Sequence, residues 1–382
     1  MTKLLILIEN KAENGAMVSL RWFLQWLVSI RQFDITLFHL AYGGNLPDVP
    51  SQVHQIGYPE WVAHSRLSNI PVANAIRRPR LLFQALGLKL IPRWASMSNV
   101  WKGIFCAHRE RYDLAISFAD DFCNRVVGGF RANKHFAWNH EDYIAQGLDE
   151  RWQVANRESL VQLDGVFCVS EAAKSSLLQV MNSKVVPIHI FHNLLDVEKA
   201  SFAPVAICHS HKVRLLSVGR LCKEKRFDII IDIARTLLEE GIDFLWTVVG
   251  DGEMLQLLQR QVEVANLKDF VKFVGVQQNW PRNYSRDHIY VQTSGAEGWG
   301  LALEEAALAG YRCVCSDIPV FHEIANFLQT RFLYGKSVRD FATAIIAATK
   351  ISDAPKVNDR AVLKAYDAEK RNFLIACGVK SN

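Results

Sequence analysis

The stretch EGWGLALEEAALAG, residues 297–310, joins a glycine-rich turn to a run of strong helix formers. Its Ala, Leu and Glu residues favour a helix that begins near Leu301, so Glu297 precedes the helix. The glycines at positions 298 and 300 allow a tight turn and let the backbone approach another group closely. The first N–H groups of such a helix lack internal partners and lie at the positive end of its dipole. The stretch therefore predicts a helix N-terminus that suits a phosphate group.

Short apolar runs bounded by turn residues alternate with helical patterns around this stretch, which is typical of parallel α/β layers. We expect strands at residues 3–8, 34–38, 52–57, 113–118, 134–138, 165–170 and 185–191, and again at 213–219, 244–250, 271–275, 288–294 and 311–317. We expect helices near residues 226–240, 254–266, 301–309 and 337–350. Ligands of such sheets bind beyond the carboxyl ends of the strands. The residues that follow each strand are therefore the candidates for a functional site.

The length of 382 residues is about that of two domains. A polar stretch with little periodicity, near residues 197–212, separates the two sets of strands. We therefore expect two Rossmann-like, doubly wound α/β domains that face each other across a cleft, over residues 1–197 and 198–354. Residues 355–382 carry an amphipathic helical pattern, and we expect this segment to pack back on the first domain.

The positive charge of the chain is concentrated in its first part. Residues 1–112 hold 13 Lys and Arg against 6 Asp and Glu. Residues 77–102 mix basic with large apolar side chains, which predicts either peripheral contact with an anionic membrane or a helix pair with a solvated basic face. No DNA- or RNA-binding pattern accompanies the charge, so we expect no nucleic-acid partner.

The composition also bears on compartment and cofactors. No apolar run is long enough for a transmembrane helix, and the N-terminal sequence is not typical of a signal peptide. The eight cysteines are scattered without a Cys-x-x-Cys pair, so we expect reduced, buried thiols. These features predict a cytoplasmic protein, either free or peripheral on the cytoplasmic face of the membrane. The segment CHSH, residues 208–211, lacks a second pair of ligands, and we expect no metal and no cofactor.

Two basic residues follow the strand that we expect at residues 213–219. Arg220 can bind two phosphate oxygens with its planar guanidinium, and Lys225 adds a second positive charge. On an open surface such a pair would be a solvated cluster, but after a strand and before a helix it favours a phosphate site. The segment VVGDGEMLQLL, residues 248–258, lacks the third glycine of a dinucleotide fingerprint, and we interpret it as a tight turn before the next helix.

The segments VGRLCKEK, VVGDGE, VKFVG and SGAEGWGLALEEAALAG, in this order, resemble the donor-binding half of family 4 retaining glycosyltransferases, also called glycosyl transferases group 1. The resemblance covers residues 213–330, and its most specific element is the E-x7-E pattern of Glu297 and Glu305. It implies a GT-B fold, in which two Rossmann-like domains face each other. It also implies that Arg220 and Lys225 neutralise the diphosphate of a nucleotide sugar.

The same resemblance assigns the remaining donor contacts. It implies that Glu297 faces the transferred sugar and that Glu305 holds the ribose hydroxyls. A carboxylate can accept hydrogen bonds from both hydroxyls of a vicinal diol. The backbone at Gly300 and Leu301 would contact the phosphates. Glu304 is one residue, about 100° of helix turn, away from Glu305 and cannot share its site, so we expect it to face solvent.

The first half resembles the family in separate segments. In ILIENKAENGAMVSL, Gly15 has the place of a glycine that lies beside the donor phosphate. AWNHEDY resembles a segment at a strand end, which implies that His140 contacts the sugar and the acceptor hydroxyl. Ser170, Asn193 and Asp196 lie in further matching segments, and we expect them to line the cleft or to form turns.

Asp120 and Asp121 follow the strand that we expect at residues 113–118. They could contact an acceptor sugar, or they could cap the next helix. Both remain candidates for the acceptor side of the site.

The sequence therefore predicts a retaining, metal-independent glycosyltransferase. It would move a hexose or N-acetylhexosamine from a nucleotide-diphosphate sugar, a UDP-sugar above all, to a glycan or lipid-linked saccharide acceptor in cell-envelope polysaccharide or lipopolysaccharide synthesis. The expected catalytic residues are His140, Arg220, Lys225 and Glu297. Two alternatives stay open: a sugar-nucleotide epimerase or hydrolase on the same scaffold, and a non-catalytic glycan-binding subunit.

Overall fold

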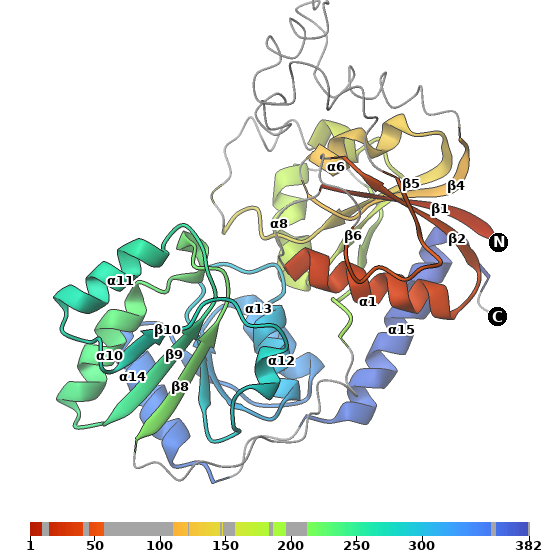
Figure 1. The fold of residues 1–382 in the computed structure, drawn as a ribbon. Helices are drawn as coiled ribbons and strands as arrows, with labels where there is room; N and C mark the ends of the chain where they lie inside the picture. Colours follow the sequence, from red (N-terminus) through yellow and green to blue (C-terminus); the bar gives the residue numbers. More distant parts are fainter. Residues whose placement is uncertain are drawn as a thin grey trace, which may run out of the picture.

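The computed structural model of the chain describes residues 1–9, 15–40, 46–56, 110–120, 122–145, 147, 157–182, 186–195, 212–352 and 357–380. Within these ranges the chain forms two parallel β-sheets, one in each half of the sequence, with helices packed against them (Figure 1). The expected α/β fold of two doubly wound domains is confirmed. The basic segment 77–102, the CHSH segment and the expected domain boundary after residue 197 lie outside the described residues.

The described part of the first sheet has seven parallel strands in the order β3-β2-β1-β4-β5-β6-β7. They are β1 Thr2–Ile8, β2 Phe33–His39, β3 His54–Ile56, β4 Tyr112–Ser117, β5 Ala132–Asn139, β6 Gly165–Cys168 and β7 Ile188–Ile190. Residues 4–8 of the central strand β1 are completely buried, because a parallel sheet is covered on both faces. The strand order reverses between β1 and β4, which opens a crevice at their carboxyl ends.

The second sheet has six parallel strands within the described residues, in the order β10-β9-β8-β11-β12-β13. They are β8 Val213–Val218, β9 Phe244–Val249, β10 Val271–Phe273, β11 Ile289–Gln292, β12 Arg312–Ser316 and β13 Leu333–Gly335. Here the order reverses between β8 and β11. The loops after these two strands carry Arg220, Lys225, Glu297 and Gly300, and the helix that follows the second loop carries Leu301 and Glu305.

The longer helices alternate with the strands. In the described part of the first half they are α1 Gly15–Ser29, α6 Phe122–Val126 and α8 Glu171–Met181. The second half contains α10 Ile229–Glu239, α11 Leu255–Val264, α12 Leu301–Leu308, α13 Pro319–Phe327, α14 Val338–Thr349 and α15 Asp359–Cys377. Short 3-10 turns cover η2 Val127–Gly129, η3 Lys223–Lys225 and η4 Trp280–Arg282.

Each strand expected from the sequence is present, with small differences at its ends. The sequence did not predict β13 or α13. Strand β13 has only three residues at the edge of the sheet, which is too short for a clear periodicity. Helix α13 begins at Pro319, and proline at the first helical position was a usable signal.

Helix α15 connects the two domains. Its Phe373 lies in the aromatic core of the first domain, with ring centroids 5.2 Å from Phe23 and 5.1 Å from Phe167. Near its start, the ring of Tyr366 lies 5.4 Å from that of Phe327 in α13 of the second domain. Figure 1 shows α15 beside α1, with the start of α15 toward the second domain. One apolar cluster consequently runs from the first sheet through α15 to α12 and α13.

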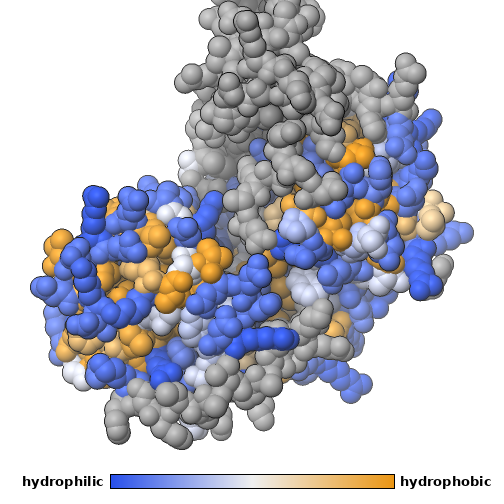
Figure 2. All heavy atoms as spheres, viewed as in Figure 1, coloured by the Kyte–Doolittle hydropathy of each residue, from blue (hydrophilic) through white to orange (hydrophobic). Residues whose placement is uncertain are grey.

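The surface of the described residues is mostly polar. Figure 2 shows hydrophilic residues over much of the second domain, with apolar residues scattered between them. The exposed ones include Leu257, Val264 and Val276, and scattered apolar residues of this kind are ordinary on a protein surface. The helices in the described ranges are all too short or too polar to cross a membrane. The six described cysteines are buried and free, as expected.

A charged clasp also joins the domains. His192, which follows the last strand of the first sheet, contacts Glu323 of α13 through Nε2 at 2.9 Å and Glu369 of α15 through Nδ1. Glu369 also accepts a hydrogen bond from the backbone N–H of His192 at 2.7 Å. Burial alone would lower the pKa of His192, but the hydrogen bonds and charges of the two glutamates outweigh it and raise this pKa to about 9. The imidazolium is therefore the form that the clasp holds.

The clasp predicts a stability that depends on pH. The folded pKa of His192, about 9, lies above the reference value of 6.5, so its contribution is complete below about pH 6.5 and is lost as the pH rises through 9. Each unit of pKa difference contributes about 1.4 kcal/mol. We expect the free energy of unfolding, measured with urea, to fall over this interval and to fall less in His192→Gln. His322→Gln, which removes a half-exposed histidine, is the control, and equal slopes for wild type and His192→Gln would contradict the clasp.

Candidate functional site between the domains

Lys225 and Glu297, which are 72 residues apart in sequence, form an ion pair at the carboxyl edge of the second sheet, with 2.5 Å between Nζ and Oε1. The same Glu297 oxygen accepts hydrogen bonds from Gln292 Nε2 at 2.8 Å and Ser294 Oγ at 2.7 Å. The Glu297 side chain is only 10% exposed. Three donors thus hold the carboxylate in one position at the carboxyl edge of the second sheet.

The sequence did not nominate Gln292 or Ser294. Gln292 ends β11, and Ser294 is two residues farther on. The rule that ligand-binding residues follow the strands could have found both.

The turn that follows Glu297 meets the first domain backbone to backbone. A Cβ on Gly298 would lie 1.7 Å from the carbonyl oxygen of His140, so only glycine fits there. The carbonyl of Gly298 accepts a hydrogen bond from Ser170 Oγ at 2.7 Å. Ser170 is also the N-cap of α8, where its side chain accepts from the N–H of Ala173. The close approach that the glycine predicts is therefore to the other domain.

Helix α12 begins at Leu301, as the sequence predicts. Gly300 caps it with a φ of 111°, which favours glycine. Gly300 O accepts the first hydrogen bonds within the helix from the N–H groups of Leu303 and Glu304. The N–H groups before them lie at the positive end of the dipole, which suits an anion. Gly15, at the start of α1, faces this end, since a Cβ on it would lie 3.3 Å from Leu301 Cδ1.

Glu305 lies farther along α12. Its Oε2 accepts a hydrogen bond from Trp280 Nε1 at 2.9 Å. Burial raises the pKa of Glu305 to about 7, although the bond from Trp280 opposes this. The carboxyl can therefore change its charge near neutral pH. The sequence did not nominate Trp280, whose ring stacks on Tyr290 at 5.5 Å.

His140 contributes a neutral imidazole from the first domain. Burial lowers the pKa of His140 to about 3, against a hydrogen bond with the backbone of Phe118. Its Nε2 is buried and has no hydrogen-bond partner among the described residues. A buried nitrogen without a partner is unfavourable unless a ligand supplies one. Beside the contact with Gly298, this nitrogen suits a ligand hydroxyl.

Asp120 lies behind His140. Its carboxylate accepts hydrogen bonds from the backbone N–H of His140 at 3.0 Å and from Tyr143 Oη at 2.9 Å. These bonds position the loop that carries His140. Contact of Asp120 with an acceptor stays a prediction, and Asp121 lies outside the described residues. Asn193 accepts a hydrogen bond from Ser19 Oγ at 2.6 Å in the buried core, and Asp196 is not described.

Arg220 follows β8 and is exposed. Its charge lies near Glu224 and Glu253 and its side chain contacts Cys222; despite partial desolvation, these neighbours raise its pKa. Ligand atoms of Cys222, Glu224 and Glu253 lie within 4.8 Å of one another, and they are the group that could hold a metal ion among the described residues. Both glutamates are exposed, and the guanidinium beside them disfavours a cation. That the chemistry needs no metal stays a prediction.

The loop GDG, residues 250–252, packs against the backbone on both sides of Arg220. A Cβ on Gly250 would lie 1.9 Å from the carbonyl oxygen of Gly219, and one on Gly252 would lie 2.5 Å from that of Leu221. The two glycines therefore let one loop press on the other, and helix α11 begins at Leu255. The interpretation of this segment as a tight turn before a helix is confirmed.

The prediction that Glu304 faces solvent is wrong. Glu304 is completely buried, and its carboxylate accepts hydrogen bonds from Trp299 Nε1 and Tyr366 Oη, each at 2.7 Å. Burial raises the pKa of Glu304 to about 7, and the two hydrogen bonds oppose this. The reason is tertiary, because α15 covers the face of α12 that would otherwise be open.

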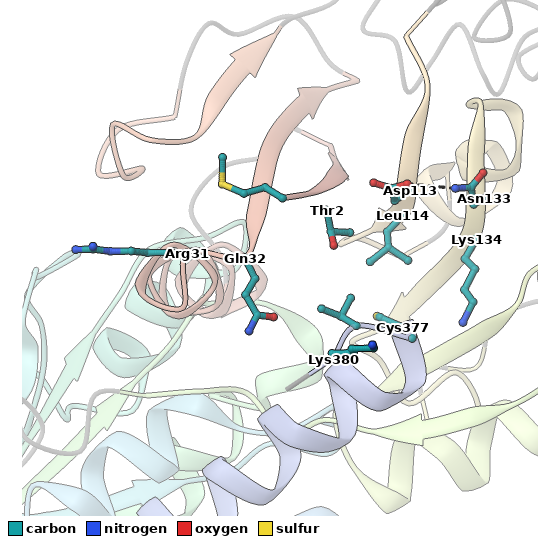
Figure 3. Close-up of a pocket in the computed structure, with 12 residues that line it drawn as sticks. Thr2, Arg31, Gln32, Asp113, Leu114, Asn133, Lys134, Cys377 and Lys380 are labelled. Atoms are coloured by element: carbon teal, nitrogen blue, oxygen red, sulfur yellow. Dashed lines mark hydrogen bonds between the residues drawn. The ribbon is translucent and has the colours of Figure 1, made fainter. Parts of the chain in front are cut away.

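A cavity of about 640 Å³ lies at the opposite, amino-terminal edge of the first sheet. Figure 3 shows Asp113, Asn133 and Lys134 from the starts of β4 and β5 around it, with Cys377 and Lys380 at the end of α15. It contains none of the residues nominated from the sequence. The candidate site therefore lies where the two domains meet, at the contacts of Gly15 with Leu301, of His140 with Gly298 and of Lys225 with Glu297.

Known proteins resemble the chain in both sequence and fold. Residues 208–367 match the family model described as "Glycosyl transferases group 1". The Escherichia coli UDP-Gal:alpha-D-GlcNAc-diphosphoundecaprenol alpha-1,3-galactosyltransferase is 26% identical over 211 residues, which are 50% of this chain and 52% of that protein. The chain thus aligns with about half the length of this relative. The amylovoran biosynthesis glycosyltransferase AmsD of Erwinia amylovora is 25% identical over 318 residues, 80% of this chain and 78% of that protein.

The fold extends over the whole chain. The crystal structure of Anabaena Alr3699/HepE in complex with UDP-glucose superposes with a TM-score of 0.68 over 98% of this chain and 99% of that one, at 16% identity. The two parallel sheets therefore form the GT-B arrangement, and the second half of the chain matches the family model of glycosyl transferases group 1.

The contact between Gly298 and His140 gives a direct test of the site. In Gly298→Ala the new methyl group would meet a backbone carbonyl that cannot move cheaply, so the turn and the first domain must separate. We expect a loss of about 3 kcal/mol in the free energy of unfolding, measured with urea. In the control Gly219→Ala the methyl group would lie 3.7 Å from its nearest neighbour, Phe227. A loss no larger than that of the control would mean that the domains do not meet at Gly298.

Proposed function

We propose that this chain, whose residues 208–367 match the family model of glycosyl transferases group 1, is a retaining, metal-independent hexosyltransferase of family 4. Its donor would be a nucleotide-diphosphate sugar, a UDP-sugar above all, and its acceptor a glycan or lipid-linked saccharide. The observation that carries the proposal is that the turn between the Lys225–Glu297 pair and the N-terminus of α12 contacts the backbone of His140 across the two domains.

Departure of a nucleoside diphosphate leaves negative charge on the phosphate oxygens. Lys225 and the first N–H groups of α12 would stabilise that charge from fixed positions, and Arg220 would add a mobile guanidinium from the same edge. Lys225 pairs with Glu297 within the protein itself. In the complex the Lys225 ammonium would also contact the diphosphate. This interaction would strengthen as the leaving group departs, because negative charge develops on the phosphate oxygens.

The sugar would lie between Glu297 and His140. Glu297 is held by Lys225 and two neutral donors, and its other oxygen can accept from sugar hydroxyls. The neutral His140 would bind a hydroxyl through Nε2. In the reaction the bond between the anomeric carbon and the phosphate oxygen breaks, the acceptor oxygen bonds to the same face of that carbon, and its proton passes to the departing phosphate. Retention of configuration follows from this geometry.

Glu305 would bind the ribose. Trp280 occupies one of its oxygens and leaves the other for a hydroxyl. The buried carboxylate of Glu305 suits a diol, because a charge-assisted hydrogen bond is stronger where water is excluded.

The named relatives support the donor and acceptor classes. The galactosyltransferase of Escherichia coli carries UDP-Gal and a diphosphoundecaprenol acceptor in its name, AmsD belongs to amylovoran biosynthesis, and the Anabaena structure contains UDP-glucose. We propose that this chain likewise acts in cell-envelope polysaccharide or lipopolysaccharide synthesis. Peripheral contact of residues 77–102 with an anionic membrane stays a prediction from their composition.

A screen of sugar nucleotides by calorimetry tests the proposal, with Lys225→Ala as the informative variant. Wild type should bind one of them and transfer its sugar, which mass spectrometry of the acceptor detects. Lys225→Ala should lower kcat about a hundredfold, because a positioned charge on the leaving group is lost. Lys223→Ala removes an equal charge from the same turn, where Lys223 is exposed, and should keep normal turnover. Release of free sugar without transfer would favour a hydrolase, and an altered free sugar nucleotide would favour an epimerase.

The ribose role of Glu305 predicts a pH-dependent affinity. Glu305→Gln should raise the Kd for UDP about tenfold, the effect of losing one hydrogen bond to a charged group. Because the pKa of Glu305 is about 7, its carboxyl ionises as the pH rises through neutrality. The wild-type affinity should therefore rise relative to that of the variant between about pH 6 and pH 8. Ionisation of the UDP phosphate affects both proteins equally. Glu239→Gln, an exposed change in the same domain, is the control, and an unchanged Kd in Glu305→Gln would remove Glu305 from the ribose site.

A further inference from the structure

The buried carboxylate of Glu304 has no part in the chemistry proposed above. It lies one residue before Glu305 on α12, on the face that α15 covers, and it is completely buried. A buried carboxylate is costly unless hydrogen bonds compensate for the lost water. Two side chains donate such hydrogen bonds to Glu304, Trp299 from the turn formed by residues 297–300 and Tyr366 from α15, at 2.7 Å each.

Trp299 is the middle side chain of the turn formed by residues 297–300. Its indole is 2% exposed, and its ring centroid lies 4.4 Å from that of His192 and 5.6 Å from that of Phe327. These rings pack against the indole, and the carboxylate of Glu304 accepts a hydrogen bond from its N–H. The indole is therefore fixed in both position and rotation.

The rest of the turn has few side chains of its own to hold it. Gly298 and Gly300 have none, and Gly298 is anchored through its carbonyl to Ser170. Glu297 is held by Lys225, Gln292 and Ser294. A nucleotide that recruits Lys225 would remove one of these three bonds. Trp299 then remains the side chain that keeps the centre of the turn in place.

We infer that Glu304 is a positioning residue of the donor site: by holding the indole of Trp299, it fixes the turn that presents Glu297 and the N-terminus of α12 to the donor diphosphate. Through Tyr366 the same carboxylate ties this turn to α15, and α15 is embedded in the first domain. The inference rests on the proposed function only for the identity of the ligand. The fixed geometry of the turn is a property of the protein alone.

A purely structural carboxylate would affect stability without affecting the turn. Trp246 offers a matched comparison, because its buried indole N–H also donates one hydrogen bond, to Ser217 Oγ at 3.0 Å, in the core of the same domain. Trp246→Phe therefore loses an indole and a hydrogen bond away from the turn. Tyr366→Phe loses one donor to Glu304 but leaves the bond to Trp299.

The first experiment measures the Kd for UDP by calorimetry and the melting temperature for each variant. We expect Trp299→Phe and Glu304→Gln each to raise the Kd about tenfold. The double variant should be little worse than either single one, because both changes remove the same bond. Trp246→Phe should lower the melting temperature but keep the wild-type Kd, and Tyr366→Phe should change the Kd less than Glu304→Gln. Wild-type Kd values in Trp299→Phe and Glu304→Gln would overturn the inference.

The second experiment needs no nucleotide. The indole N–H signal of Trp299 in the NMR spectrum is identified by its absence from Trp299→Phe, and its exchange with deuterium is followed. We expect slow exchange in wild type and in Tyr366→Phe, and fast exchange in Glu304→Gln and Glu304→Leu. Unchanged exchange in the two Glu304 variants would overturn the inference. If wild type binds no sugar nucleotide while these exchange rates change as expected, the proposed function fails and the positioning of the turn by Glu304 holds.

Discussion

The contact between the backbone of Gly298 and the carbonyl of His140 is the constraint on which the rest of the site depends. No side chain fits between them, because a Cβ would lie 1.7 Å from that oxygen. The contact presses the loop after β5 of the first domain on the loop after β11 of the second. It thereby brings the loop that carries His140, whose buried Nε2 has no partner among the described residues, against the turn that follows Glu297. Ser170 secures the same place by capping α8 and binding the Gly298 carbonyl.

Burial acts on the ionisable groups around this contact in opposite ways, and the partners decide the outcome. His140 has little to stabilise its charge, so burial lowers its pKa to about 3 and it is neutral. His192 is buried too, but two glutamates raise its pKa to about 9. Glu304 and Glu305, side by side on α12, both have a pKa near 7, because desolvation exceeds the effect of their hydrogen bonds. Neutral and charged groups thus lie close together, each in the form that its neighbours favour.

Helix α15 explains how a site made of loops can be held in place. It comes last in the chain, yet its Phe373 lies in the core of the first domain and its Tyr366 binds Glu304 of the second. Its Glu369 completes the clasp on His192. Helix α12, helix α13 and the end of the first domain therefore all contact α15. A displacement of either domain would have to break buried hydrogen bonds, which are costly to leave unmade.

The sequence by itself determined the two α/β layers, each expected strand, the start of α12 at Leu301 and the candidates at the strand ends, because these depend on local periodicity and on turn chemistry. It could not show what lies across the cleft. The glycine at position 298 predicted a close approach of the backbone to another group. The sequence did not identify that group as the carbonyl of His140, since the contact joins residues of different domains. The burial of Glu304 was missed for the same reason: helix periodicity says which side chains share a face, and only the packing of α15 decided that this face is dry. Local sequence rules predict the helices and strands. The hydrogen-bond partners and the charges of the site residues depend instead on burial between segments that are distant in the sequence.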